Sequence, residues 1–198
     1  MTIGENPLPT AAVNVVRDWG DGELLVPERH DVLPWDLAIQ HLAGAQLFWH
    51  VTHRPDTNAH VRPVFAVESD GMLCSTTSAG ARKTRLLERD PRCSLAASTD
   101  GMDLVYEGIA RRVREPDQLG RIATAYRRKY AWPVTVTPDG AFEAPFGAPA
   151  AGPPPYHVYA FGPVTVWGFG TDDRYAARST RWDFDRWSSG RPGRRAGS

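Results

Sequence analysis

Short runs of strand-forming residues, separated by turn formers, constrain the fold of this sequence more than any other feature. Two of the separating turns, at 70–71 and 100–101, contain Asp-Gly. Such pairs are typical of the tight turns that join antiparallel strands. The runs lie at 46–53, 60–67, 72–77, 93–98, 104–114, 156–161 and 164–169. This pattern predicts a mainly β, α+β domain built as a closed or nearly closed antiparallel barrel of six or seven strands.

Three other segments carry apolar residues with the periodicity of amphipathic helices. The predicted helices are 34–44, 81–89 and 117–130. Residues 1–33 show little periodicity and are expected to form an extended arm. Residues 185–198 are rich in Arg, Gly and Ser, so we expect a disordered tail there. The Pro/Gly-rich residues 132–155 form a connection longer than compact domains usually contain.

The composition indicates one folded domain. Of 198 residues, 41% are hydrophobic and 23% are charged. The 23 basic and 23 acidic residues cancel, so the net charge gives no reason to expect a nucleic-acid or membrane partner. Two cysteines, Cys74 and Cys93, are too few for a disulfide framework, and we interpret both as small core residues. The first residues lack the basic and apolar regions of a signal peptide, so we expect a cytoplasmic protein.

The segment CSTTSAGARKTRLLERDPR has the composition of an anion-binding site. A strand ends in Thr76, Thr77 and Ser78, and the predicted helix opens with Arg82 and Lys83. The start of a helix presents unpaired backbone N–H groups, and cations in its first turn oppose the helix dipole. Two adjacent cations there are best explained by an anion that lies between them and the helix.

The alternative for this segment is a solvated helix surface. In that case Arg82, Arg85 and Arg89 pair with Glu88 and Asp90 and bind no ligand. The spacing of the charges fits both interpretations.

The strand HVRPVFAV places a charge among apolar residues. Alternation puts His60, Arg62 and Val64 on one face. A charged side chain in an apolar strand is costly unless it is paired. Arg62 therefore either faces solvent beside Glu68 or reaches an anionic ligand. Pro63 lacks an N–H group, which interrupts the ladder and leaves backbone groups free to meet a ligand ring.

Four consecutive motifs, HVRPVFAV, SDGMLCSTT, ARKTRLLERDPR and CSLAA, resemble the flavin-binding split-barrel family. That family contains the pyridoxamine 5'-phosphate oxidases and the flavin/deazaflavin oxidoreductases. EGIARRV, YRRKYAW, YHVYAF and TRWDF are similar to one branch of it. The resemblance covers residues 34–184 and implies a flavin-binding split-barrel domain, with a few short flanking helices, over that range.

The resemblance implies a set of cofactor-binding residues. They are Arg62, Pro63 and Val64 along the ring, Thr76 at the ring or its ribityl chain, Thr77 and Ser78 as hydroxyl donors, and Arg82 and Lys83 at the phosphate. Two departures argue against pyridoxamine phosphate oxidase activity itself. Ala66 and Val67 stand where those enzymes carry a basic residue at the end of the strand, and TRWDF does not reproduce their C-terminal Arg/His substrate motif.

The implied function is a flavin- or deazaflavin-dependent oxidoreductase. The bound cofactor, FMN or coenzyme F420, would exchange a hydride with a small organic substrate. Because the cofactor carries the chemistry, no catalytic side chain is predicted. One alternative is a non-catalytic protein that binds or sequesters the same cofactor on the same fold.

Histidines suggest a third possibility, haem binding. His50, His53, His60 and His157 are the candidate axial ligands. We expect no metal site from His50 and His53, because residues three apart on a strand point to opposite faces.

Late aromatic residues allow two interpretations. Trp167, Phe169, Tyr175 and Trp182 belong either to the core or to a wall that stacks on a planar ring from a second subunit. Members of the family are homodimers with cofactors at the subunit interface. The resemblance therefore implies a homodimer in which Trp167 and Trp182 lie at the cofactor, with no nucleic-acid or membrane partner.

Overall fold

The computed structural model describes residues 7–15, 32–55, 58–147 and 152–185. The helices are α1 (Trp35–Gly44), α2 (Arg82–Arg89) and α3 (Pro116–Tyr130), with a short 3-10 helix at Ala176–Arg178. The strands are β1 (Ala11–Asn14), β2 (Phe48–Thr52), β3 (His60–Val64), β4 (Ala66–Ser69), β5 (Met72–Ser78), β6 (Arg92–Thr99), β7 (Met102–Val113), β8 (Thr135–Val136), β9 (Phe142–Glu143), β10 (Tyr156–Gly170) and β11 (Thr180–Asp183). Residues 186–198 of the predicted tail and most of the predicted arm lie outside the described residues.

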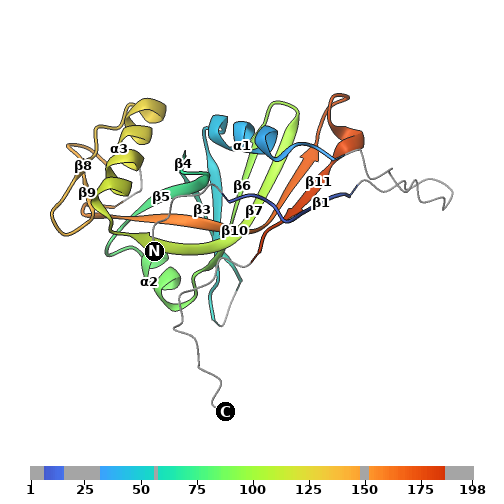
Figure 1. Ribbon diagram of the computed structural model, residues 1–198. Helices are drawn as coiled ribbons and strands as arrows, with labels where there is room; N and C mark the ends of the chain where they lie inside the picture. Colours follow the sequence, from blue (N-terminus) through green and yellow to red (C-terminus); the bar gives the residue numbers. More distant parts are fainter. Residues whose placement is uncertain (1–6, 16–31, 56–57, 148–151, 186–198) are drawn as a thin grey trace, which may run out of the picture.

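The strands form an antiparallel barrel, as predicted (Figure 1). Around the barrel, β2 pairs with β3, β4 with β5, β5 with β10, β10 with β7, β7 with β6, and β6 with β2. The circle closes because β3 continues into β4 through Phe65, so one stretch of chain pairs with β2 first and with β5 afterwards. The fold is a split antiparallel barrel of the α+β class.

Strand β10 differs from the prediction. Two paired strands at 156–161 and 164–169 were expected, and this was wrong, because the structure has one strand of 15 residues. The Gly162-Pro163 pair that suggests a turn is instead accommodated by an irregularity in the pairing with β7. The chain stays extended there because β7 runs along one edge of β10, while β5 and then β11 occupy the other.

Short strands account for the rest of the difference between six or seven predicted strands and the eleven found in the described residues. Strands β8 and β9 form a small hairpin within the connection at 132–155. The predicted strand at 60–67 is divided into β3 and β4. At the edge of the sheet, β11 adds to β10 and β1 adds to β11, so residues 11–14 of the predicted arm form a strand.

Two apolar clusters fill the molecule. The first lies inside the barrel and includes Phe48, Tyr106 and Phe161. The second lies between the barrel and α3 and includes Ile122, Tyr126 and Cys74. Cys74 and Cys93 are both buried, as predicted. Within the described part of the chain, no helix is both long and apolar enough to cross a bilayer.

Candidate functional site

The candidate site begins at the break between β3 and β4, where the chain diverges from β5. Strands β4 and β5 are paired as far as Ala66 and Ser75, and before Phe65 the chain pairs with β2 instead. Strand β5 continues to Ser78, and α2 begins four residues later at Arg82. The predicted residues of β3 and those of β5 therefore lie on the two sides of this divergence.

Basic side chains gather at the α2 end of the divergence. His60, at the start of β3, is 4% exposed. Burial lowers its pKa, and Arg62, Arg54, Arg82 and Lys83 lower it further. These four cations, which we call the basic cluster, come from β3, from the segment that follows β2, and from the first turn of α2. Three of the predicted residues, Arg62, Arg82 and Lys83, thus lower the pKa of the same buried histidine.

Lys83 is the most confined member of the basic cluster. Its side chain is half-buried, and burial lowers its pKa to about 8. Neither an ion pair nor a hydrogen bond joins Lys83 to any described residue. Arg82 is exposed. The residue that caps α2, Ala81, has no side chain that could satisfy the first N–H groups, and the first turn contains no acid. This helix start therefore has the properties of an anion site.

The hydroxyl residues at the end of β5 are fixed against α2. Thr84 donates a hydrogen bond to the backbone oxygen of Ser78 over 2.7 Å, and its hydroxyl lies 3.4 Å from that of Thr77. Thr77 and Ser78 are buried, whereas Thr76 is half-buried. Thr84 was not identified from the sequence, although a hydroxyl residue in the first turn of a helix is a signal for such a tether.

His50 is a buried polar residue near the anion site that the sequence analysis did not include in that site. It is 1% exposed, lies opposite Arg62 on the neighbouring strand, and meets Phe161 edge to face at 5.1 Å. Neither ring nitrogen has a hydrogen-bond partner among the described residues. Burial lowers its pKa to about 3, and Lys83 and His60 contribute to the shift. Alternation places His50 on the inner face, but the sequence does not show that its nitrogens lack partners.

The late aromatic residues divide between two faces. Trp182 is 1% exposed, packs on Trp35, and donates its indole N–H to the oxygen of Leu33. Trp182 is therefore a core residue and does not reach a cofactor, which corrects the expectation. Trp167 lies on the outer face of β10, where its ring stacks on that of Phe169 at 6.2 Å.

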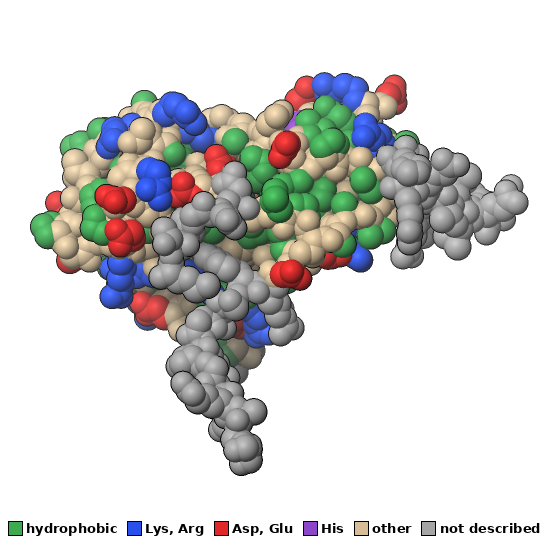
Figure 2. Space-filling model, viewed as in Figure 1, with side chains coloured by type: hydrophobic (Ala, Val, Ile, Leu, Met, Phe, Trp, Pro, Cys, Tyr) green, Lys and Arg blue, Asp and Glu red, His purple; other side chains and the backbone are tan. Residues whose placement is uncertain are grey.

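The outer face of the sheet carries a row of apolar side chains. Adjacent positions across five strands are Pro63, Trp49, Ala96, Val105 and Trp167. Trp49 is 51% exposed, and Phe169 beside the row is 41% exposed. Figure 2 shows hydrophobic side chains gathered on the part of the surface that Figure 1 labels β7, β10 and β11. Pro63, which belongs to the candidate site, stands at one end of this row.

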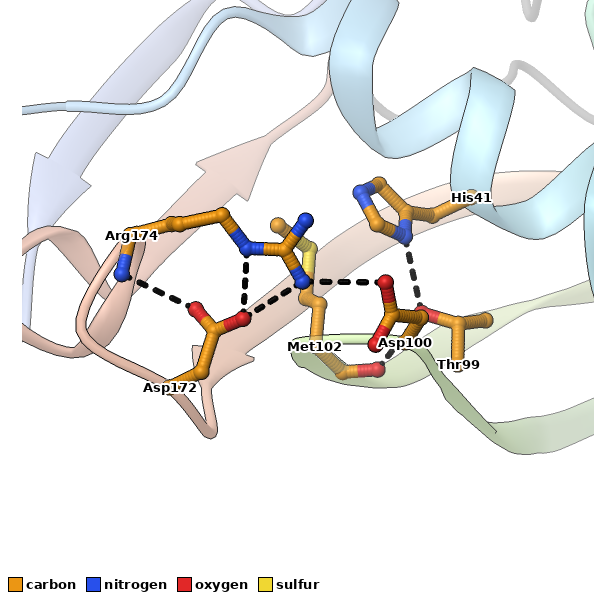
Figure 3. Close-up of polar contacts among 6 residues, drawn as sticks. All are labelled: His41, Thr99, Asp100, Met102, Asp172 and Arg174. Atoms are coloured by element: carbon orange, nitrogen blue, oxygen red, sulfur yellow. Dashed lines mark hydrogen bonds and ion pairs between the residues drawn. The ribbon is translucent and has the colours of Figure 1, made fainter.

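A second polar cluster lies away from this site and holds loops together (Figure 3). Arg174 pairs with Asp172 in its own loop and with Asp100 in the turn between β6 and β7. Thr99 donates its hydroxyl hydrogen to the backbone oxygen of Met102. In the 2.8 Å contact between His41 and the Thr99 hydroxyl, the histidine N–H is therefore the donor. A pocket of about 640 Å³ lies beside His41, Thr99 and Trp49. None of the predicted cofactor-binding residues lines it.

Comparison with solved structures supports the fold. A protein described as FAD-binding from Mesorhizobium loti is 15% identical, with a TM-score of 0.51, over 76% of this chain and 95% of its own. A conserved hypothetical protein from Mycobacterium tuberculosis is 18% identical, with a TM-score of 0.50, over 83% of this chain and 97% of its own. At these identities the likeness concerns the fold alone. No curated protein sequence matches the chain.

A match to a family model identifies the family of this protein. The family model described as pyridoxamine 5'-phosphate oxidase matches residues 38–170, which is more than half of the chain. The match extends from α1 to the end of β10, so it includes the complete barrel and the start of α2. This protein belongs to the pyridoxamine 5'-phosphate oxidase family.

Proposed function

We propose that this protein binds FMN or coenzyme F420 by its phosphate and acts as an oxidoreductase on a small organic substrate. When bound, a flavin or deazaflavin ring supplies the hydride chemistry. The protein then has to hold the phosphate, support the ring and exclude water. Cys74 and Cys93 are buried and unpaired, in keeping with a reducing cytoplasmic setting.

The basic cluster is the observation that carries the proposal. Arg54, Arg62, Arg82 and Lys83 all lower the pKa of His60, and none of them forms an ion pair with an acid in the described residues. Four cations close together repel one another, and Lys83 also bears a desolvation cost. A phosphate would relieve both costs, since it accepts charge-assisted hydrogen bonds from lysine and from the fork of arginine.

The broken strand gives the cofactor ring a place beside the phosphate site. Residues 62–64 form part of an edge where β3 pairs with β2 alone, and Pro63 contributes no N–H group to a ladder. Thr76, a half-buried residue, lies across the divergence. We propose that Pro63 and Val64 support one side of the ring and that Thr76 orients it or its ribityl chain.

The apolar row supports a homodimer with the cofactor at the interface. Trp49 and Trp167 project onto one sheet face, and Trp49 is directly opposite Pro63. A second copy of the chain would cover this face, and a two-fold axis lets the same row meet itself. A ring along β3 would then lie against the partner, which excludes water from it.

The test of the oxidoreductase proposal is turnover by the loaded protein. Protein saturated with FMN or F420 is reduced anaerobically and mixed with candidate acceptors such as quinones, nitroaromatic compounds and enones. Multiple turnovers, followed by the absorbance of the cofactor, support the proposal. Tight binding of the cofactor without reaction with any acceptor beyond the rate of free cofactor would contradict enzymatic activity and favour a binding protein.

A further inference from the structure

A pocket that the proposed function does not use lies at the end of α1. Its volume is about 640 Å³, which is within the ordinary range for small-molecule sites. The C-terminal half of α1 contributes Gln40, His41 and Gly44, strand β2 contributes Trp49, and the turn between β6 and β7 contributes Asp100. Trp49 also belongs to the apolar row, whereas the other four residues lie outside it.

Contacts from other elements hold the walls of this pocket in place. The Nδ1 of His41 donates to the hydroxyl of Thr99 over 2.8 Å, which joins α1 to the end of β6 (Figure 3). The loop that follows α1 is fixed from α3, where Tyr130 donates to the backbone oxygen of Gln46 at 3.2 Å. A site whose walls are fixed in advance loses less conformational freedom when it binds a ligand.

The charges at the pocket favour a cation. Asp100 lines the pocket, and its side chain is 92% exposed. Asp100 and Asp172 share one cation, Arg174, so this group of side chains has an excess of negative charge. Among the described residues that line the pocket there is no lysine and no arginine. The C-terminal end of α1 adds the partial negative charge of the helix dipole.

The apolar wall of the pocket suits a flat ligand. Trp49 and Leu47 both line the pocket, and they are 51% and 43% exposed. Indole attracts a cation over its face more strongly than the other aromatic side chains do. With Nδ1 as the donor to Thr99, neutral His41 keeps an acceptor nitrogen, Nε2. Aromatic surface, acceptors and excess negative charge are thus brought together in one pocket.

We propose that this pocket binds a flat aromatic cation, which stacks on Trp49 and directs its positive charge toward Asp100 and the end of α1. The site is separate from the basic cluster, because none of the predicted cofactor-binding residues lines it. Its charge preference is also the opposite, since the basic cluster suits the phosphate of a cofactor. The inference therefore holds whether or not the protein binds a flavin.

The experiment titrates two probes of three fused rings into the full chain, followed by probe fluorescence and by calorimetry. Proflavine is a cation at neutral pH, and anthracenecarboxylate is an anion of similar size and shape. Gly44→Leu fills the pocket, because Gly44 lines it and a Cβ there would meet nothing within 4 Å. Gly120→Leu in α3 is its control, since a Cβ there is equally free but lies outside the pocket. Asp100→Asn removes the charge, and its control is Asp173→Asn, an exposed aspartate that does not line the pocket.

We expect wild type to bind proflavine more tightly than anthracenecarboxylate. Gly44→Leu should weaken proflavine by about tenfold or more, because the new side chain occupies the space of the ligand, and Gly120→Leu should bind like wild type. Asp100→Asn should weaken proflavine by about two- to fivefold, the small effect expected of an exposed charge, and Asp173→Asn should not. The melting temperatures of both glycine variants should not fall, since leucine favours a helix more than glycine does.

Saturation with FMN separates this pocket from the proposed cofactor site. Because the two sites share no residue, FMN should leave the affinity for proflavine unchanged. Displacement of proflavine by FMN, equal affinities for the two probes, or equal proflavine affinity in wild type and Gly44→Leu would overturn the inference. Absence of saturable proflavine binding to wild type would overturn it as well. Failure of FMN and F420 to bind would overturn the proposed function alone.

Discussion

Lys83 shows at the scale of single residues how burial and charge reveal a binding site. Its position beside Arg82 at a helix start is visible in the sequence, and it predicts an anion. The sequence does not show that Lys83 is half-buried without a counter-ion among the described residues, because that depends on how α2 lies across the barrel. For the same reason, the sequence does not show that the ring nitrogens of His50 lack hydrogen-bond partners among the described residues, because long-range packing decides which polar atoms meet them.

A pH dependence of stability follows from the shifted pKa of Lys83. Burial lowers this pKa from 10.5 to about 8, so between those values the unfolded chain binds more protons than the folded one. Stability of the ligand-free protein should therefore rise with pH through this range. Lys83→Met should be more stable than wild type near pH 7, with a gap that narrows by pH 10.

Thermal unfolding of both proteins across this range, in phosphate-free buffer, measures the gap. Lys129 also has a pKa lowered to about 8 by burial, but it is present in both proteins and cancels. A gap that stays constant with pH would show that Lys83 is not desolvated.

At the scale of elements, the break between β3 and β4 is a feature that the local sequence does not predict. Alternation correctly puts His60 and Val64 inward, but Ala66 and Val67 are both buried because the chain bends at Phe65. The bend exposes backbone oxygens that α3 satisfies. Tyr126 donates to the oxygen of Phe65 at 3.1 Å. Lys129 and Tyr130 donate to that of Ala66 at 2.9 and 2.8 Å. These partners follow some sixty residues later, so no local pattern could predict the bend.

Two glycines test how closely β7 and β10 approach each other. A Cβ on Gly108 in β7 would lie 2.5 Å from the backbone oxygen of Gly162 in β10, whereas one on Gly120 in α3 would meet nothing within 4 Å. Gly108→Ala should destabilise the fold by about 1–3 kcal/mol through overpacking. Gly120→Ala should stabilise it by about 0.5–1 kcal/mol, since alanine is the better helix former. Chemical denaturation measures both, and equal effects of the two substitutions would contradict the close approach of β7 and β10.

At the scale of the whole molecule, the apolar row predicts how two copies of the chain assemble. A dimer that buries Trp49 and Trp167 should dissociate when a charge replaces either, because a buried unpaired carboxylate is costly. Trp49→Glu should lower the mass seen by light scattering from a dimer to a monomer. Val136→Glu is the control, because Val136 is similarly exposed but lies on β8, outside the row. A wild-type monomer at micromolar concentration with cofactor present would contradict the dimer.

The central claim is that the start of α2 binds the phosphate of the cofactor, and a titration of FMN tests it most directly. Wild type, Arg82→Ala, Lys83→Ala and the control Arg89→Ala, at the other end of α2, are compared by flavin fluorescence and by thermal unfolding without ligand. Loss of one charge-assisted hydrogen bond costs about 1.5–3 kcal/mol. Lys83→Ala should therefore weaken FMN by roughly ten- to hundredfold, and Arg82→Ala by at least as much because its fork bonds twice. Arg89→Ala should bind like wild type, and ligand-free melting should not fall in either of the first two variants. Equal affinity for FMN in all four proteins would contradict the account.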